Sequence, residues 1–114
     1  MAQFHIDYFE LPAADAGASG DFFEKAFGWS LKAYGPDYVE LQGAGTMGGI
    51  NGDSRDRSGH PAIGIRTDDI AAAAAAIVKA GGTITRPTYA YPGGRRFFFR
   101  EPGGNELMVY HPAE

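Results

Sequence analysis

Histidine and carboxylate side chains are the candidates for polar chemistry here, because the 114-residue sequence contains no cysteine. The absence of thiols excludes disulfides, zinc–thiolate sites and cysteine nucleophiles. His60, Glu10 and Glu106 are of the types that hold hard or borderline divalent ions. His5 and His111 are more typical of edge or partly buried histidines with a hydrogen-bond partner. No Ser–His–Asp arrangement stands out by spacing.

A glycine-rich segment matches the dinucleotide-binding pattern G-x-G-x-x-G at residues 43–48. That motif needs a helix directly after it, so that the helix N-terminus can face the pyrophosphate. The residues after Gly48 favour a strand instead, so we expect a hairpin turn and no dinucleotide site.

Charge and hydropathy exclude two classes of partner. The net charge is −4 and there is no cluster of Lys and Arg, whereas a nucleic-acid binder needs a basic face. No apolar run approaches the length that spans a bilayer, so we expect no membrane partner. The N-terminus lacks a basic segment followed by an apolar stretch, so we expect a soluble protein of the cytoplasm.

Hydrophobic periodicity predicts two helices and eight short strands. Asp15 and Asp69 are candidate N-caps of helices that end at Gly28 and at Gly81–Gly82. The apolar face of the first helix is expected at Phe22, Phe23, Ala26 and Phe27, and that of the second at Ile70, Ala74, Ile77 and Val78. Strands are predicted at 4–11, 29–34, 38–42, 46–51, 62–67, 83–88, 96–100 and 106–111. The turn-rich segment 52–59 separates the halves, and 86–94 is predicted to be a loop that could cover a cavity.

The two halves match each other in sequence. At an offset of 54, Asp15 falls on Asp69, Lys25 on Lys79 and Gly28 on Gly82. Each half has the order strand, helix and three strands, which together with the offset indicates duplication. We therefore predict a single α+β domain, 1–114, of two βαβββ modules at about 4–51 and 60–111. Helices should cover the outside of a curved mixed sheet that surrounds a cup.

Four segments carry a family resemblance over nearly the whole chain. They are FELPAAD, DFFEKAFGW, RTDDIAAAAAAIVKAGGTI and REPGGNELMVY, in that order. They resemble the glyoxalase/bleomycin-resistance proteins of the vicinal oxygen chelate superfamily, although Glu101 replaces the usual Asp of the last segment. The resemblance implies the paired-module fold, frequent homodimers and, in the family's enzymes, a divalent metal held by the first and last strand of each module.

The family's metal positions correspond here to Tyr8, Gly49, Ala62 and Met108. Alanine and glycine have no donor side chain, methionine prefers soft ions and neutral tyrosine is a poor ligand. We therefore expect no cofactor and no metal at the usual site. A shifted divalent metal site built from His60, Glu10 and Glu106 is the alternative, because each lies two residues from a ligand position and period-two alternation keeps it on the same face.

Strand alternation from the ligand positions predicts the side chains that line the cup. Tyrosine and methionine would supply apolar area, and the charged groups would orient a small molecule. The acidic residues favour a cationic ligand, although the aromatic side chains could equally fill a collapsed cup. The predicted ligand-binding residues are Tyr8, Glu10, Arg66, Glu106, Met108 and Tyr110.

Three functions remain open from the sequence. The first is a metal-free small-molecule-binding protein of the glyoxalase/bleomycin-resistance type that binds an aromatic or cationic compound. The second is a metal-dependent lyase, isomerase or dioxygenase with a shifted site. The third is a dimeric interaction module, in which one side of the Phe97–Phe99 strand meets a partner subunit. No catalytic residue is assigned.

Overall fold

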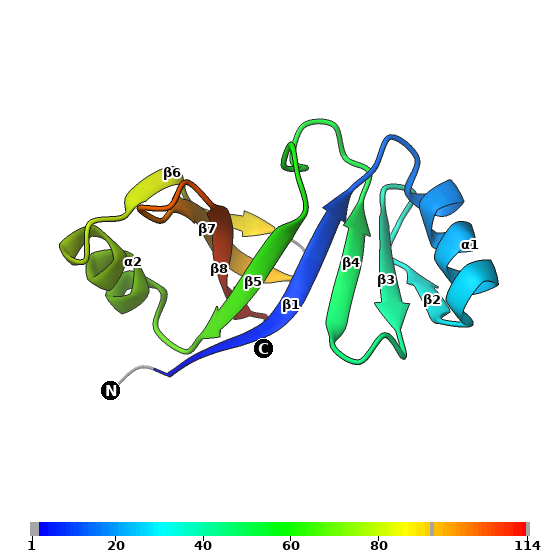
Figure 1. Cartoon of the computed structure of the whole chain (residues 1–114), viewed down its shortest axis with the longest axis horizontal. Coiled ribbons are helices and arrows are strands. Elements are labelled where there is room, and N and C mark those ends of the chain that lie inside the picture. Colours follow the sequence, from blue (N-terminus) through cyan, green and yellow to red (C-terminus); the bar gives the residue numbers. More distant parts are fainter. Residues whose placement is uncertain (1–2, 92, 114) are drawn as a thin grey trace. The chain divides into compact units, whose positions relative to one another are not determined.

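The computed structural model describes residues 3–91 and 93–113 and divides the chain into two compact units (Figure 1). The first unit is residues 8–62, and the second is residues 1–7 with 63–114. The elements are β1 Phe4–Pro12, α1 Ala16–Phe27, β2 Ser30–Ala33, β3 Tyr38–Gln42, β4 Met47–Asn51, β5 Ala62–Thr67, α2 Ile70–Lys79, β6 Thr83–Tyr91, β7 Gly94–Arg100 and β8 Glu106–Pro112.

Each unit has the predicted order of one helix and four strands. The strands of the first unit run in the order β2-β3-β4-β1, and those of the second in the order β5-β8-β7-β6. Both arrangements are mixed, because β1 pairs with β4 and β5 with β8 in parallel while the remaining pairs are antiparallel. The predicted α+β fold of two βαβββ modules is thus confirmed. The beginning of β1, however, belongs to the second unit.

Both helices begin at the predicted aspartates. The carboxylate of Asp15 accepts a hydrogen bond from the backbone of Ala18 at 3.0 Å, and that of Asp69 accepts one from Ala72 at 3.0 Å. These bonds satisfy amide groups that a helix leaves unpaired in its first turn. Gly28 ends α1 with a φ of 75°, a left-handed conformation that favours glycine. The N-caps of both helices and the C-terminal glycine of α1 were therefore predictable from the sequence.

The core of the first unit lies between α1 and strands β3 and β4. Its buried members are Ala16, Val39, Leu41 and Ile50. The predicted helix face was only partly correct, because Phe23 packs on this core while Phe22 and Phe27 are each 60% exposed. The helix instead approaches the sheet through Gly20, where an added Cβ would lie 3.3 Å from side chains of β2 and β3.

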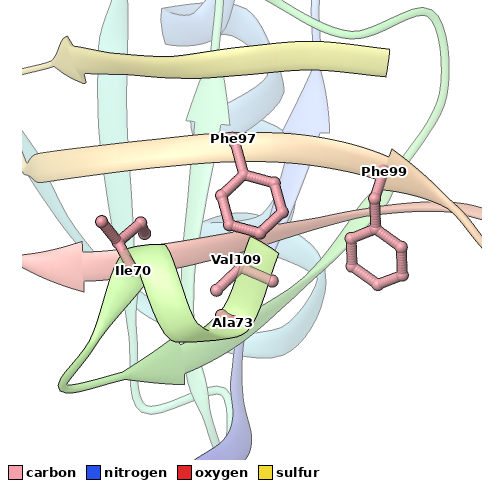
Figure 2. Packing of buried hydrophobic residues seen from close by; sticks show 5 residues of the cluster. All are labelled: Ile70, Ala73, Phe97, Phe99 and Val109. Carbon is pink, nitrogen blue, oxygen red and sulfur yellow. The ribbon is translucent and has the colours of Figure 1, made fainter. Parts of the chain in front are cut away.

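The core of the second unit is the cluster between α2 and strands β7 and β8 (Figure 2). It contains Ile70, Ala73, Phe97, Phe99 and Val109. Phe97 and Phe99 point to the same side because side chains alternate along a strand. Val78 was predicted to face the core and is 59% exposed, so that prediction was wrong.

The predicted loop at 86–94 is wrong over most of its length. Strand β6 continues to Tyr91 and β7 begins at Gly94, which makes a tight hairpin, and Pro92 lies outside the described residues. The pairing of β6 with β7 is irregular near Arg86, where the register shifts. Aromatic and arginine side chains of the two strands stack on one another, and this contact extends the strands past the predicted end.

The turn before β8 shows how Glu101 serves in place of the family's aspartate. Its carboxylate accepts hydrogen bonds from the backbone of Gly103 at 2.7 Å and from the backbone and side chain of Asn105 at 2.9 and 2.7 Å. The backbone bonds hold the pKa of Glu101 below its ordinary value. Within the described residues, none of the helices is long and apolar enough to cross a membrane.

Candidate functional site

A buried carboxylate, Glu10 of β1, organises the sheet face of the first unit. Glu10 is 1% exposed, and its two oxygens accept hydrogen bonds from the Tyr38 hydroxyl at 3.1 Å and from the Asn51 amide at 3.0 Å. The Tyr8 hydroxyl contacts the Tyr38 hydroxyl, and the Asn51 amide also donates to Asp56 at 2.9 Å. A buried charge is costly unless hydrogen bonds satisfy it, and these bonds do so here.

Electrostatics keep Tyr38 in its neutral form. Burial, the adjacent charge of Glu10 and the contact with Tyr8 raise the pKa of Tyr38 far above the ordinary tyrosine value. The Tyr38 hydroxyl therefore remains a hydrogen-bond donor to Glu10 throughout the physiological range. The group acts as a closed polar cluster, which we call the Glu10 cluster and define as Tyr8, Glu10, Tyr38, Asn51 and Asp56.

The Glu10 cluster contains Tyr8 and lies against Gly49, two of the four positions at which the resemblance implies metal ligands. An added Cβ at Gly49 would overlap the Tyr38 hydroxyl and would lie 2.5 Å from the Tyr8 hydroxyl. No side chain longer than a hydrogen therefore fits at residue 49 while both tyrosines keep these positions. Together with Ala62 and Met108, which are 2% and 1% exposed and offer no oxygen or nitrogen donor, these residues do not fit the metal that the family implies.

A second polar group lies on the sheet face of the second unit. Arg66 Nε donates to Asp7 Oδ2 at 2.8 Å, and the Tyr110 hydroxyl donates to the other oxygen of Asp7. The guanidinium carbon of Arg66 also lies 5.6 Å from the centre of the Tyr110 ring. Burial and its hydrogen bond to Asp7 raise the pKa of Tyr110, and the separate hydrogen bond from Arg66 to Asp7 raises the pKa of Arg66.

Met108 lies beside a buried arginine that the sequence analysis did not single out. Arg96 is 1% exposed; its Nη1 lies 3.5 Å from the Met108 sulfur, and its Nε donates to the Tyr89 hydroxyl at 2.7 Å. The rings of Tyr91 and Phe98 lie 4.4 and 5.3 Å from the guanidinium carbon. Guanidinium groups stack favourably on aromatic faces, so these rings hold Arg96 in place.

Sheet register places the predicted residues of the second unit on neighbouring strands. Arg66 is paired with Tyr110, and Gly64 with Met108. Glu106 lies at the start of β8, where its carboxylate accepts a hydrogen bond from Thr85 at 2.5 Å. Arg66, Tyr110 and Met108 thus lie close together, whereas Glu106 is held by β6.

A cavity of about 380 Å³ opens at one end of the second unit, where β5 and β8 end and β1 begins. It is lined by Gln3, His5, Arg66, Thr67, Asp68, His111, Pro112 and Ala113. The sequence predicted His5 and His111 only as edge or partly buried histidines, with no connection between them. Their shared position at strand ends, 106 residues apart, becomes visible only once the strands are aligned in the fold.

The alternative metal set is not found as a group. Across residues 3–91 and 93–113, no group of three or more His, Cys, Asp and Glu side chains is placed to hold a metal ion. Within the first unit, the His60 Nδ1 atom lies 2.8 Å from the carbonyl of Pro61, and Glu10 is bonded within its cluster.

Solved structures share the fold of this chain at low sequence identity. A structure described as an NAD-dependent benzaldehyde dehydrogenase from Legionella pneumophila has a TM-score of 0.80 at 10% identity and covers 94% of this chain and 99% of its own. A glyoxalase/bleomycin resistance protein/dioxygenase superfamily member from Vibrio splendidus 12B01 has a TM-score of 0.68 at 17% identity and covers 99% and 100%. Methylmalonyl-CoA epimerase from Mycobacterium tuberculosis has a TM-score of 0.68 at 14% identity and covers 96% and 88%. These likenesses show the fold alone.

Sequence comparison establishes the family. No curated protein matches the chain. The profile of a single family, however, extends over residues 5–109, which includes both βαβββ modules and every residue of the Glu10 cluster. The chain belongs to the Glyoxalase/Bleomycin resistance protein/Dioxygenase superfamily.

Proposed function

We propose that this chain is a small-molecule-binding protein of the glyoxalase/bleomycin-resistance type that works without a metal ion at the family's usual position. The observation that carries the proposal is the row of side chains on the second unit, where Arg66 pairs with Tyr110 and the neighbouring Met108 pairs with Gly64. A small residue beside a thioether and a tyrosine gives apolar side chains on neighbouring strands, with one charged group to orient a ligand.

The row has buried and partly exposed members. Met108 and Tyr110 are 1% and 5% exposed, whereas Arg66 and Glu106 are partly exposed at the two ends of the row. An aromatic compound would contact Tyr110 and Met108 by displacing the side chains that cover them, with its polar group at Arg66 or Glu106. In the first unit, Tyr8 and Glu10 act as support, because both oxygens of Glu10 already accept hydrogen bonds.

A thermal-shift screen with aromatic compounds of either charge, in the presence of EDTA, tests the proposal. We expect at least one compound to raise the melting temperature, with no change when EDTA is replaced by Mn²⁺, Ni²⁺ or Zn²⁺. Glu106→Gln should weaken a cationic compound, and Phe22→Ala on the exposed surface of α1 is the matched control. Stabilisation that requires an added metal would favour the metal-dependent enzyme instead. No stabilisation by any compound under either condition would contradict ligand binding.

We also propose that the protein is a homodimer, which is the assembly that the resemblance implies. Phe4 and Ile6 of β1 and Ile63 of β5 are 47%, 68% and 46% exposed. Alternation places these side chains on the face opposite to Asp7 and Arg66. A second copy would cover this apolar strip. Light scattering should give twice the monomer mass, and Ile6→Ser should lower it; a monomeric mass for the native chain would contradict the proposal.

A further inference from the structure

The cavity at the strand ends of the second unit combines opposite charges on one wall. Arg66 and Asp68 both line it, two residues apart on the same segment of chain. This cavity differs from the row of Met108 and Tyr110, and only Arg66 belongs to both. Its volume of about 380 Å³ lies within the range of small-molecule sites.

Arg66 has donors left for a ligand. A guanidinium carries five N–H groups; the one on Nε donates to Asp7, and Tyr110 is a second hydrogen-bond partner, which leaves further donors for a ligand. The side chain is 41% exposed, so its terminal nitrogens are reachable from solvent. The Nε bond and the Tyr110 ring fix the orientation of the guanidinium plane, and a fixed plane suits the two oxygens of a carboxylate.

Asp68 supplies the complementary acceptor. Its Oδ1 receives a long hydrogen bond of 3.4 Å from the backbone nitrogen of Gln3, which holds the carboxylate near the start of β1. A carboxylate has a second oxygen, which can accept a hydrogen bond from a ligand in the cavity that Asp68 lines. With Asp7 already bonded to Arg66, the formal charges of Asp7, Arg66 and Asp68 sum to −1, which disfavours a multiply charged anion such as a phosphate.

The remaining wall is suited to a carbon side chain. His5, His111 and Pro112 present rings, and the Nδ1 atom of His111 lies 3.1 Å from the carbonyl of Pro112. Rings of this kind provide flat contact area for an aliphatic or aromatic group.

We propose that this cavity binds a free α-amino acid, with the carboxylate on Arg66, the ammonium group on Asp68 and the side chain against the rings of His5 and His111. The charge pattern accounts for the choice, because a zwitterion is the small ligand that satisfies one cation and one anion together. The site goes beyond the proposed function, since it needs neither Met108 nor Tyr8.

Isothermal titration with matched probes tests the proposal. The probes are L-phenylalanine, L-leucine, 3-phenylpropionate, which lacks the amine, and 2-phenylethylamine, which lacks the carboxylate. We expect one of the two amino acids to bind. If phenylalanine is the one, it should bind about tenfold more tightly than either single-charge analogue, because each analogue loses one charged hydrogen bond. If leucine is the one that binds, 4-methylpentanoate and 3-methylbutylamine replace the aromatic analogues.

Two variants locate the binding. Asp68→Asn should lower the affinity for the amino acid about tenfold and leave the affinity for the carboxylate analogue unchanged. Arg66→Lys should lower the affinity for both. Asp21→Asn, on the exposed surface of α1, is the matched control and should change neither. Circular dichroism of each variant shows whether it is folded. If Arg66→Lys does not fold, Asp68→Asn still tests the proposal.

Three results would overturn the inference: no binding of either amino acid, equal binding of the analogues, or amino-acid binding that Asp68→Asn leaves intact. Failure here would leave the proposed function standing, because the screen for aromatic compounds concerns Met108 and Tyr110. Conversely, amino-acid binding that depends on Asp68 would survive if that screen found no compound.

Discussion

Both units carry polar groups on their sheets, but these groups differ in how far they are buried and hydrogen-bonded. In the first unit, Glu10 is 1% exposed and bonded through both oxygens. In the second, the Arg66 side chain is 41% exposed and borders a cavity. A duplicated module can thus turn one copy of a site into a structural cluster while the other copy keeps donors for a ligand. The difference predicts that changes in the first unit act on stability and changes in the second on binding.

The largest expected effect is the loss of the buried carboxylate. Glu10→Ala should lower the free energy of unfolding by about 3 kcal/mol, because it leaves the Tyr38 hydroxyl and the Asn51 amide buried without their acceptor. Chemical denaturation measures the change, and Glu10→Gln, which keeps one acceptor oxygen, should cost less. A loss below about 1 kcal/mol for the alanine variant would show that the cluster is not structural.

A smaller loss is expected from filling the space at Gly49. Gly49→Ala should lower the free energy of unfolding by about 2 kcal/mol, because Tyr38 and Tyr8 must move to admit the methyl group. The matched control is Gly59→Ala, where an added Cβ meets nothing within 4 Å. If both substitutions proved equally neutral in denaturation curves, the tyrosine hydroxyls would not fill the space at Gly49.

In the second unit, Tyr110→Phe should cost about 1 kcal/mol, the usual net value of one hydrogen bond. It removes the donor to Asp7 and keeps the ring beneath Arg66. The comparison between units is sharpened if this variant also changes ligand affinity in the thermal-shift screen, whereas Glu10→Gln does not. A stability loss as large as that of Glu10→Ala would erase the distinction.

The smallest effect concerns alkaline pH. Because the folded-state pKa of Tyr38 lies far above the ordinary value of 10.0, the folded state binds more protons than the unfolded state there. The contribution of Tyr38 to stability is therefore complete below the unfolded-state pKa of 10.0. It is lost as the pH rises from that value through the folded-state pKa. At pH 10 one such tyrosine should account for about 0.4 kcal/mol of lost stability relative to pH 8. Tyr38→Phe should remove that part of the slope in denaturation curves, and an unchanged slope would contradict it.

Local signals in the sequence were sufficient for most of the elements. Asp15, Asp69 and Gly28 act through hydrogen bonds and backbone angles within a few residues, so their roles follow from chemistry close in the chain. The faces of the helices were harder, because Phe22, Phe27 and Val78 are apolar residues that tertiary packing leaves exposed. Strand β6 outlasted its predicted end because its aromatic side chains stack on Arg96 of the next strand.

The partners of the site residues were not predictable. Tyr38 and Asn51, which hold Glu10, lie 28 and 41 residues away from it and carry no motif. Alternation predicted Arg66, Met108 and Tyr110 on one face of the sheet, but it could not predict that the register pairs Arg66 with Tyr110. It did not identify Arg96, because the three consecutive phenylalanines that follow predict a packed strand and give no sign of a buried charge. The cavity was missed because strand ends have no periodic pattern.

The bond between Asp7 and Tyr110 has a consequence for how the chain acquires its structure. These residues are 103 positions apart, so ribosomal synthesis delivers the acceptor long before the donor. Residues 4–7 of β1 must therefore wait for the second unit, while residues 8–12 can already pair with β4. Contacts of such high sequence separation form late and slow folding. During that interval the apolar side chains of Phe4 and Ile6 lie on an unpaired strand, which favours aggregation.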